Sequence, residues 1–116
     1  MIKNQFIYVA HPFGGDKANK YSIDTIMENL VMLDKNNTYL SPLHNFSMLY
    51  FDTQYAKGLK ICLDMLNKCD ALVLCGEWET SKGCIGEWSF AIAKGMPIYT
   101  WKEWTDKLKE QGDNSR

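Results

Sequence analysis

Residues Cys69–Tyr99, CDALVLCGEWETSKGCIGEWSFAIAKGMPIY, decide the predicted fold of this chain. The apolar run Ala71–Cys75 predicts a buried strand, and a polar turn follows it. A helix is then expected over Lys82–Lys94, ended by Gly95 as a glycine stop. Pro97–Thr100 predicts another strand. A strand, a helix and a strand in this order indicate a parallel pair with a right-handed crossover.

The rest of the chain repeats this alternation. Gln5–Ala10 and Thr38–Leu40 predict two further strands, and either Asp16 or Asn19 could cap the first helix. That helix carries apolar residues at helical spacing: Ile23, Ile26, Met27, Leu30 and Leu33. Later helices are expected from about residue 50 to residue 68 and over residues 101–110.

The pattern as a whole predicts an α/β fold with a parallel sheet of four or five strands and helices on both faces. Residues 1–110 form one domain, and residues 111–116 are expected to be a frayed tail. Ligands of such sheets bind beyond the carboxyl ends of the strands. Three polar segments fall at that edge, namely 11–16, 41–45 and 76–81.

Composition narrows the classes of function. The net charge of −1 gives no general attraction to nucleic acid polymers, so a small anionic ligand would need local donors. No apolar stretch approaches the ~18 residues of a membrane span, and the start of the sequence lacks a signal peptide pattern. We therefore expect a cytoplasmic protein with no membrane partner.

The four cysteines do not suggest a metal centre, because no two of them form a CxxC pair. Reduced and mostly buried thiols are the favoured interpretation. A zinc site from Cys84 with His11 or His44 is the weaker alternative, and we predict no metal and no cofactor.

The sharpest motif is Ser81-x-Gly83-x-x-x-Glu87. Ser81 as an N-cap would offer its hydroxyl and the following N–H groups to an anion. Gly83 and Glu87 are four residues apart on one helix face, so a ligand passing Gly83 could reach the Glu87 carboxylate. That carboxylate could act as a nucleophile or a base. The alternative is an ordinary capped helix with a surface glutamate.

Other candidates lie in the loops. The Phe13-Gly14-Gly15 turn could curl around a phosphate or ribose, or be a tight turn only. His44 could contact a base or a ribose or simply be exposed. His11 has the better location of the two and is a candidate ligand-binding residue, although its exact role is undetermined.

Two further features carry weaker signals. Trp78 could stack on a base. The apolar run 48–51 could cover a pocket or make a dimer contact, and Asp70 is more plausibly structural.

Five segments together resemble the nucleoside 2-deoxyribosyltransferase-like superfamily, and specifically its short, uncharacterised branch in bacteria and their phages. The resemblance extends to about residue 100. Its segments are YVAHPFGG (8–15), SPLH (41–44), CDALVL (69–74), GEWETSKGCIGE (76–87) and AKGMP (93–97).

The resemblance implies a flavodoxin-like (Rossmann-like) sheet and a homodimer or higher homo-oligomer. It also implies that Glu87 attacks the anomeric carbon of a (deoxy)nucleotide or deoxynucleoside and displaces the base. Tyr8 would orient the Glu87 carboxylate, whereas the residues alone would indicate that Tyr8 is a core residue. Ser81 would hold a 5′-phosphate, and Gly14 and Gly15 would contact the sugar-phosphate.

One position departs from this pattern. Active relatives carry an aspartate eight residues ahead of the position of Asp70, where this chain has Cys62. That carboxylate helps protonate the leaving base, and general acid catalysis is worth roughly 10²–10⁴-fold in rate. The leading hypothesis is therefore an N-glycosidase or deoxyribosyltransferase-like enzyme. The alternatives are a non-catalytic binder that sequesters a nucleotide-derived signal, as a phage anti-defence protein would, and a simple interaction protein.

Overall fold

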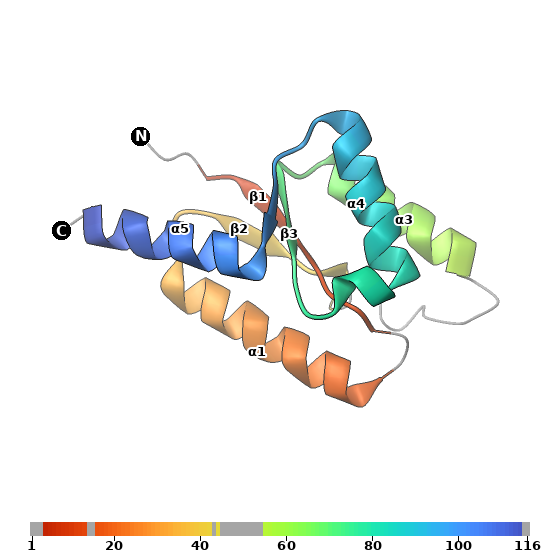
Figure 1. The fold of residues 1–116 in the computed structure, drawn as a ribbon, viewed down its shortest axis with the longest axis horizontal. Coiled ribbons are helices and arrows are strands. Elements are labelled where there is room, and N and C mark those ends of the chain that lie inside the picture. The colour runs from red at the N-terminus through yellow and green to blue at the C-terminus, as the bar shows by residue number, and fades with distance from the viewer. Residues whose placement is uncertain (1–3, 14–15, 43, 45–54, 115–116) are drawn as a thin grey trace.

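A computed structural model describes residues 4–13, 16–42, 44 and 55–114. The elements alternate between strands and helices along the chain (Figure 1). They are β1 (Phe6–Ala10), α1 (Lys17–Leu33), β2 (Thr38–Leu40), α3 (Tyr55–Asn67), β3 (Ala71–Leu74), the short 3₁₀ helix η3 (Trp78–Thr80), α4 (Lys82–Lys94), β4 (Ile98–Thr100) and α5 (Trp101–Asn114).

The four strands form one parallel sheet in the order β2-β1-β3-β4. Tyr8 of β1 is in register with Leu40 on one side and Leu72 on the other, and Leu72 pairs in turn with Ile98. This order belongs to a flavodoxin-like α/β sheet, in which the strand order reverses beside the first strand. The predicted fold class is confirmed.

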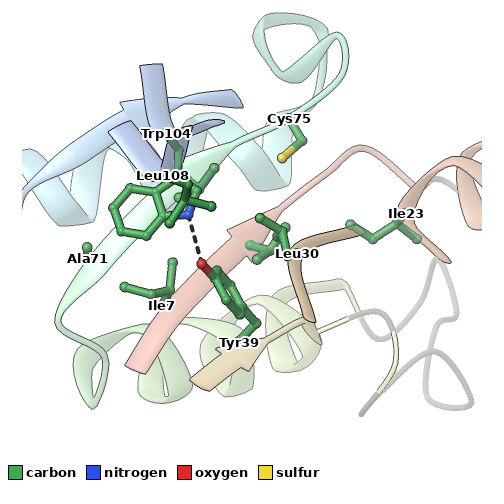
Figure 2. Close-up of a cluster of buried hydrophobic side chains, with 10 residues drawn as sticks. Ile7, Ile23, Leu30, Tyr39, Ala71, Cys75, Trp104 and Leu108 are labelled. Carbon is green, nitrogen blue, oxygen red and sulfur yellow. Dashed lines mark hydrogen bonds between the residues drawn. The ribbon is translucent and has the colours of Figure 1, made fainter. Parts of the chain in front are cut away.

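Helices cover both faces of the sheet, with α1 and α5 on one face and α3 and α4 on the other (Figure 1). Successive side chains of a strand point to opposite faces of the sheet, so the core consists of two clusters, one on each face. Figure 2 shows the cluster under α1 and α5. Its members are Ile7, Val9, Ile23, Leu30, Tyr39, Ala71, Val73, Cys75, Trp104 and Leu108.

The cluster under α3 and α4 takes the other residues of the same strands. It contains Tyr8, Ala10, Leu66, Cys69, Leu72, Leu74, Cys84, Ala91 and Met96. Each buried aliphatic side chain here contributes about 1.5–3 kcal/mol to stability by leaving water. Tyr8 is the one member of this set with a hydroxyl, and that hydroxyl needs a partner inside the core.

Local signals in the sequence set most of the element boundaries. Helix α4 spans the predicted residues, with Ser81 as N-cap and Gly95 as C-cap in the left-handed region at φ 77°. Asp16, rather than Asn19, caps α1 by accepting from the Ala18 N–H at 2.8 Å. The sequence did not predict η3, and α5 continues to residue 114, so residues 111–114 are helical where a frayed tail was expected.

Two polar contacts fix the amino edge of the sheet. Asp70 accepts a hydrogen bond from the Phe6 N–H at 2.8 Å, while the Asp70 N–H donates to the Phe6 carbonyl at 2.7 Å. The structural role expected for Asp70 is thus what the structure shows. Asp34 is buried at the end of α1 and accepts from the Tyr39 hydroxyl at 2.5 Å. Within the described ranges, no helix is long and apolar enough to cross a membrane.

Candidate functional site

The centre of the candidate site is a buried pair formed by Glu87 of α4 and Tyr8 of β1. Only 5% of Glu87 is exposed, and Tyr8 is completely buried. The Tyr8 hydroxyl donates a hydrogen bond to Oε2 of Glu87. Helix α4 therefore turns the carboxylate inward onto β1, one of the two central strands of the sheet. The interpretation of Glu87 as a surface glutamate is wrong.

Burial raises the pKa of Glu87 from its ordinary value of 4.5 to about 7, and the hydrogen bond from Tyr8 opposes this rise. Burial likewise raises the pKa of Tyr8 well above 10, and the negative charge of Glu87 raises it further. Tyr8 is therefore a neutral donor at any physiological pH. Glu87 titrates close to neutrality, which is unusual for a carboxyl group and typical of functional sites.

Cys62, on α3, is the third group at this centre. Burial and the nearby Glu87 raise the pKa of its half-buried thiol to about 11. Cys84, at the start of α4, is buried as well, and its pKa rises to about 12 chiefly through burial. Both thiols remain protonated at neutral pH. The buried carboxylate is thus surrounded by neutral groups.

Ser81 lies one residue before α4, as predicted. Its Oγ accepts a hydrogen bond from the Cys84 N–H at 3.2 Å, which is the geometry of an N-cap. The serine hydroxyl also has a proton that it can donate, and its hydrogen bond with the Cys84 side chain lowers the pKa of that thiol. Gly83 is half-buried one turn before Glu87. Ser81, Gly83 and Glu87 therefore share the first turns of one helix, as their spacing indicated.

Trp78 lies in η3, immediately before that helix. Its ring is half-buried and tilted by 41° against the ring of Trp88, at a centroid separation of 6.0 Å. Both rings pack against the cluster under α3 and α4. Trp88 is therefore part of the core side of α4, and a stacking role for Trp78 stays a prediction.

His11, which follows β1, is held by two hydrogen bonds. His11 donates from Nδ1 to the carbonyl of Pro12 at 2.7 Å, and its Nε2 lies 3.0 Å from the Ser22 hydroxyl on α1. Phe13 is half-buried against the cluster under α1 and α5. Phe13 thus lies on the face of the sheet opposite Glu87. Residues 14 and 15 lie outside the described residues, as does the apolar run 48–51.

His44 is exposed but engaged on both ring nitrogens. Its Nδ1 lies 2.9 Å from the Ser41 hydroxyl, and its Nε2 lies 2.5 Å from Oδ1 of Asp24. The Asp24 pKa is lowered by its hydrogen bonds to Lys20, the larger effect, and to His44. The Ser-x-x-His spacing could have predicted the first contact. The sequence offers no comparable signal for the second.

The family of this chain can be given at this point. Residues 5–100 match the family described as "Domain of unknown function (DUF4406)". The chain belongs to this family. No match was found among curated proteins. The family segment includes every residue of the candidate site, from Tyr8 to Glu87.

A solved structure supports the fold assignment. The chain is similar to a protein described as "Crystal structure of conserved protein from Enterococcus faecalis V583", with a TM-score of 0.65 and 22% sequence identity. The match covers 84% of this chain and 62% of the other, so the chain spans less than two thirds of that protein's length. At this identity the similarity concerns the fold. Among the described residues, no cluster of three or more His, Cys, Asp or Glu side chains could hold a metal ion.

Proposed function

We propose that this DUF4406 protein cleaves or transfers the N-glycosidic bond of a (deoxy)nucleotide, with Glu87 as the nucleophile. The buried hydrogen bond between Tyr8 and Glu87 carries the proposal. Burial of a carboxylate costs free energy because the group loses its solvation by water. Such a group therefore indicates a chemical role more often than a stabilising one. The resemblance of the sequence to the nucleoside 2-deoxyribosyltransferase-like superfamily also implies that Tyr8 orients the carboxylate of Glu87.

The proposed reaction has two steps. An ionised Glu87 oxygen forms a bond to the anomeric carbon, the bond to the base breaks, and the base leaves with the electron pair and takes up a proton. Water, or a second base, then attacks the glycosyl ester and regenerates the carboxylate. Because the nucleophile must be ionised, a Glu87 pKa of about 7 makes the first step faster as the pH rises through neutrality.

Ser81 is proposed to hold the 5′-phosphate of the substrate. The N-terminus of α4 offers the hydroxyl of Ser81 and the first free N–H groups, and the helix dipole favours an anion there. A phosphate at Ser81 would place the sugar near Gly83, one turn from Glu87. Trp78, adjacent in η3, is proposed to contact the base.

Cys62 supports a second candidate, a binder that retains a nucleotide-derived signal without cleaving it. Protonation of the leaving base needs an acid near the glycosidic bond, and the Cys62 thiol, with a pKa of about 11, is a weak one. A site with the carboxylate retained but no strong acid beside it would bind nucleotides and turn them over slowly. Sequestration is the function that such a site would serve.

Chromatography of free base, released from a panel of deoxynucleoside monophosphates, tests the proposal. Wild-type protein should release base from at least one of them. Glu87→Gln keeps the size of the side chain but removes the attacking charge, so we expect base release to fall at least 10³-fold, on the order of the loss of a nucleophile. Glu79→Gln removes an exposed carboxylate from η3 and is the matched control.

The two candidates give different outcomes. Equal release from wild type and Glu87→Gln would refute the nucleophile. Tight binding of a nucleotide with no release from either protein would favour the binder, and intact ligand recovered after denaturation would identify what it retains. In that case base release should be measured for Cys62→Asp, because this variant restores a carboxylic acid at the position where active relatives carry one.

A further inference from the structure

His11 connects β1 to α1 at the carboxyl edge of the sheet. It directly follows β1, its Nδ1 donates to Pro12, and its Nε2 meets the hydroxyl of Ser22 on α1. The carbonyl of Pro12 can only accept, so Nδ1 must carry a proton. In the neutral ring Nε2 then accepts from Ser22. Both ring nitrogens are satisfied within the chain, which leaves neither for a ligand.

The same ring is in close contact with the loop after β3. Gly76 has φ +62°, and a Cβ added there would lie 2.9 Å from Nε2 of His11 and 3.2 Å from its Cδ2. Real Cβ atoms do not approach heavy atoms so closely. The backbone of Gly76 therefore lies against the edge of the imidazole, and a side chain at residue 76 would clash with the ring unless one of them moved.

Gly76 begins the loop that leads to the candidate anion site. From Gly76 the chain enters η3, whose turn is closed by hydrogen bonds from the Thr80 N–H to the Glu77 carbonyl at 3.1 Å and from the Ser81 N–H to the Trp78 carbonyl at 3.0 Å. Thr80 Oγ1 also donates to the Glu77 carbonyl, at 2.7 Å. These bonds hold residues 77–81 together as one short unit that directly follows Gly76.

We propose that His11 is a positioning residue rather than a ligand contact. Held as the Nδ1–H tautomer by Pro12 and Ser22, its ring sets the position of Gly76 and, through η3, of Ser81. This revises the ligand-binding role expected for His11. The part of the inference that concerns ligand affinity rests on the proposed function, whereas the His11–Gly76 contact does not.

The tautomer is the first test, and it needs no ligand. The chain has two histidines, so ¹⁵N-detected imidazole spectra at pH 8 are assigned with His11→Ala and His44→Ala. We expect His11 to carry its proton on Nδ1. His44 should be the internal contrast, with its proton on Nε2, because Asp24 can only accept there. A proton on Nε2 of His11 would overturn the proposal.

The contact with Gly76 is the second test. Gly76→Ala adds backbone strain at positive φ and a clash with the ring, and only the clash depends on His11. In thermal unfolding, Gly76→Ala should therefore be less destabilising in the His11→Ala background than in wild type. Equal destabilisation in both backgrounds would contradict the contact.

Affinity for 2′-deoxyadenosine 5′-monophosphate is the third test. Ser22→Ala keeps the imidazole but removes the hydroxyl that holds its Nε2, and Gly76→Ala forces the ring and the loop apart, so we expect several-fold weaker binding in both variants. Ser89→Ala, at an exposed position of α4, is the control and should not change affinity. If wild type binds neither this nucleotide nor any other member of the panel, the proposed function is wrong, while the tautomer and the Gly76 coupling still decide the role of His11. Unchanged affinity in Ser22→Ala and Gly76→Ala would refute positioning.

Discussion

Two buried carboxylates of this chain differ in how they are satisfied. Asp34 accepts from the Asn36 N–H at 2.8 Å, from Nδ2 of Asn37 at 2.7 Å and from the Tyr39 hydroxyl. At Glu87, among the residues that the structure describes, the hydrogen bond comes from Tyr8 alone. The carboxylate with several donors closes a helix end. Glu87, with a single donor, keeps unpaired lone pairs on its oxygens, and its pKa is perturbed; both features suit a role in chemistry.

The raised pKa of Glu87 predicts that wild-type stability falls as the pH rises. The pKa of this carboxyl group is higher in the folded chain than in the unfolded chain, so its proton is held more tightly in the folded state. The resulting contribution to stability is fully present below about pH 4.5, where the group is protonated in both states. That contribution is lost between 4.5 and about 7, a difference of about 3 kcal/mol in the free energy of unfolding. Glu87→Gln cannot ionise, so urea denaturation should show its advantage over wild type growing across this pH window.

Glu79→Gln is the control for this series, because its carboxyl group is exposed. Its stability should follow that of wild type from pH 4.5 to 8. A Glu87→Gln curve parallel to the wild-type curve over that range would mean that Glu87 ionises normally. Base release should move in the opposite direction to stability, rising towards pH 8 as the nucleophile ionises.

At the scale of the elements, the N-capped helices α1 and α4 allow capping to be separated from ligand binding. Asp16 caps α1 and Ser81 caps α4, each through one side-chain oxygen and one backbone N–H. Removal of either cap should cost about 0.5–2 kcal/mol of stability. Only α4 leads to Glu87.

Ser81→Ala and Asp16→Ala are therefore a matched pair. By calorimetry, Ser81→Ala should weaken the binding of a deoxynucleoside monophosphate by about tenfold or more, because a charge-assisted hydrogen bond is worth roughly 1.5–3 kcal/mol. The corresponding deoxynucleoside should bind with little change. Asp16→Ala should lose similar stability without loss of affinity. Equal losses for nucleotide and nucleoside in Ser81→Ala would place the phosphate elsewhere.

The elements also show what the sequence could and could not predict. An apolar run, an N-cap and a stop glycine are local signals, and they located β3 and α4 to within a residue. The inward direction of Glu87 could not be predicted, because it depends on how α4 packs on β1. The pairing with Tyr8 came from the family resemblance. Contacts such as His11 with Ser22 join residues without a recognisable spacing, so only the folded chain shows them.

At the scale of the whole molecule, a series of hydrogen bonds joins α5, β2 and the end of α1. Trp104 of α5 donates from Nε1 to the Tyr39 hydroxyl of β2 at 3.0 Å (Figure 2). That hydroxyl donates in turn to Asp34 at the end of α1. Tyr39 and Trp104 are nearly perpendicular, with ring centroids 6.5 Å apart. Helix α5 is thus attached to the edge strand by a polar contact inside the apolar cluster.

Tyr39→Phe should be strongly destabilising for so small a change. It leaves the buried Trp104 N–H without its acceptor, which costs about 1–3 kcal/mol, and it removes one of the three donors that the described residues provide to the buried Asp34. Tyr99→Phe is the matched control: its ring also packs on Trp104, at 5.0 Å, but its hydroxyl accepts from Lys107, and its loss should cost less than about 1 kcal/mol. Urea denaturation followed by circular dichroism measures both. Because this network lies on the face of the sheet opposite α4, base release per folded molecule should not change in either variant; a selective loss of activity in Tyr39→Phe would show that the two faces are coupled.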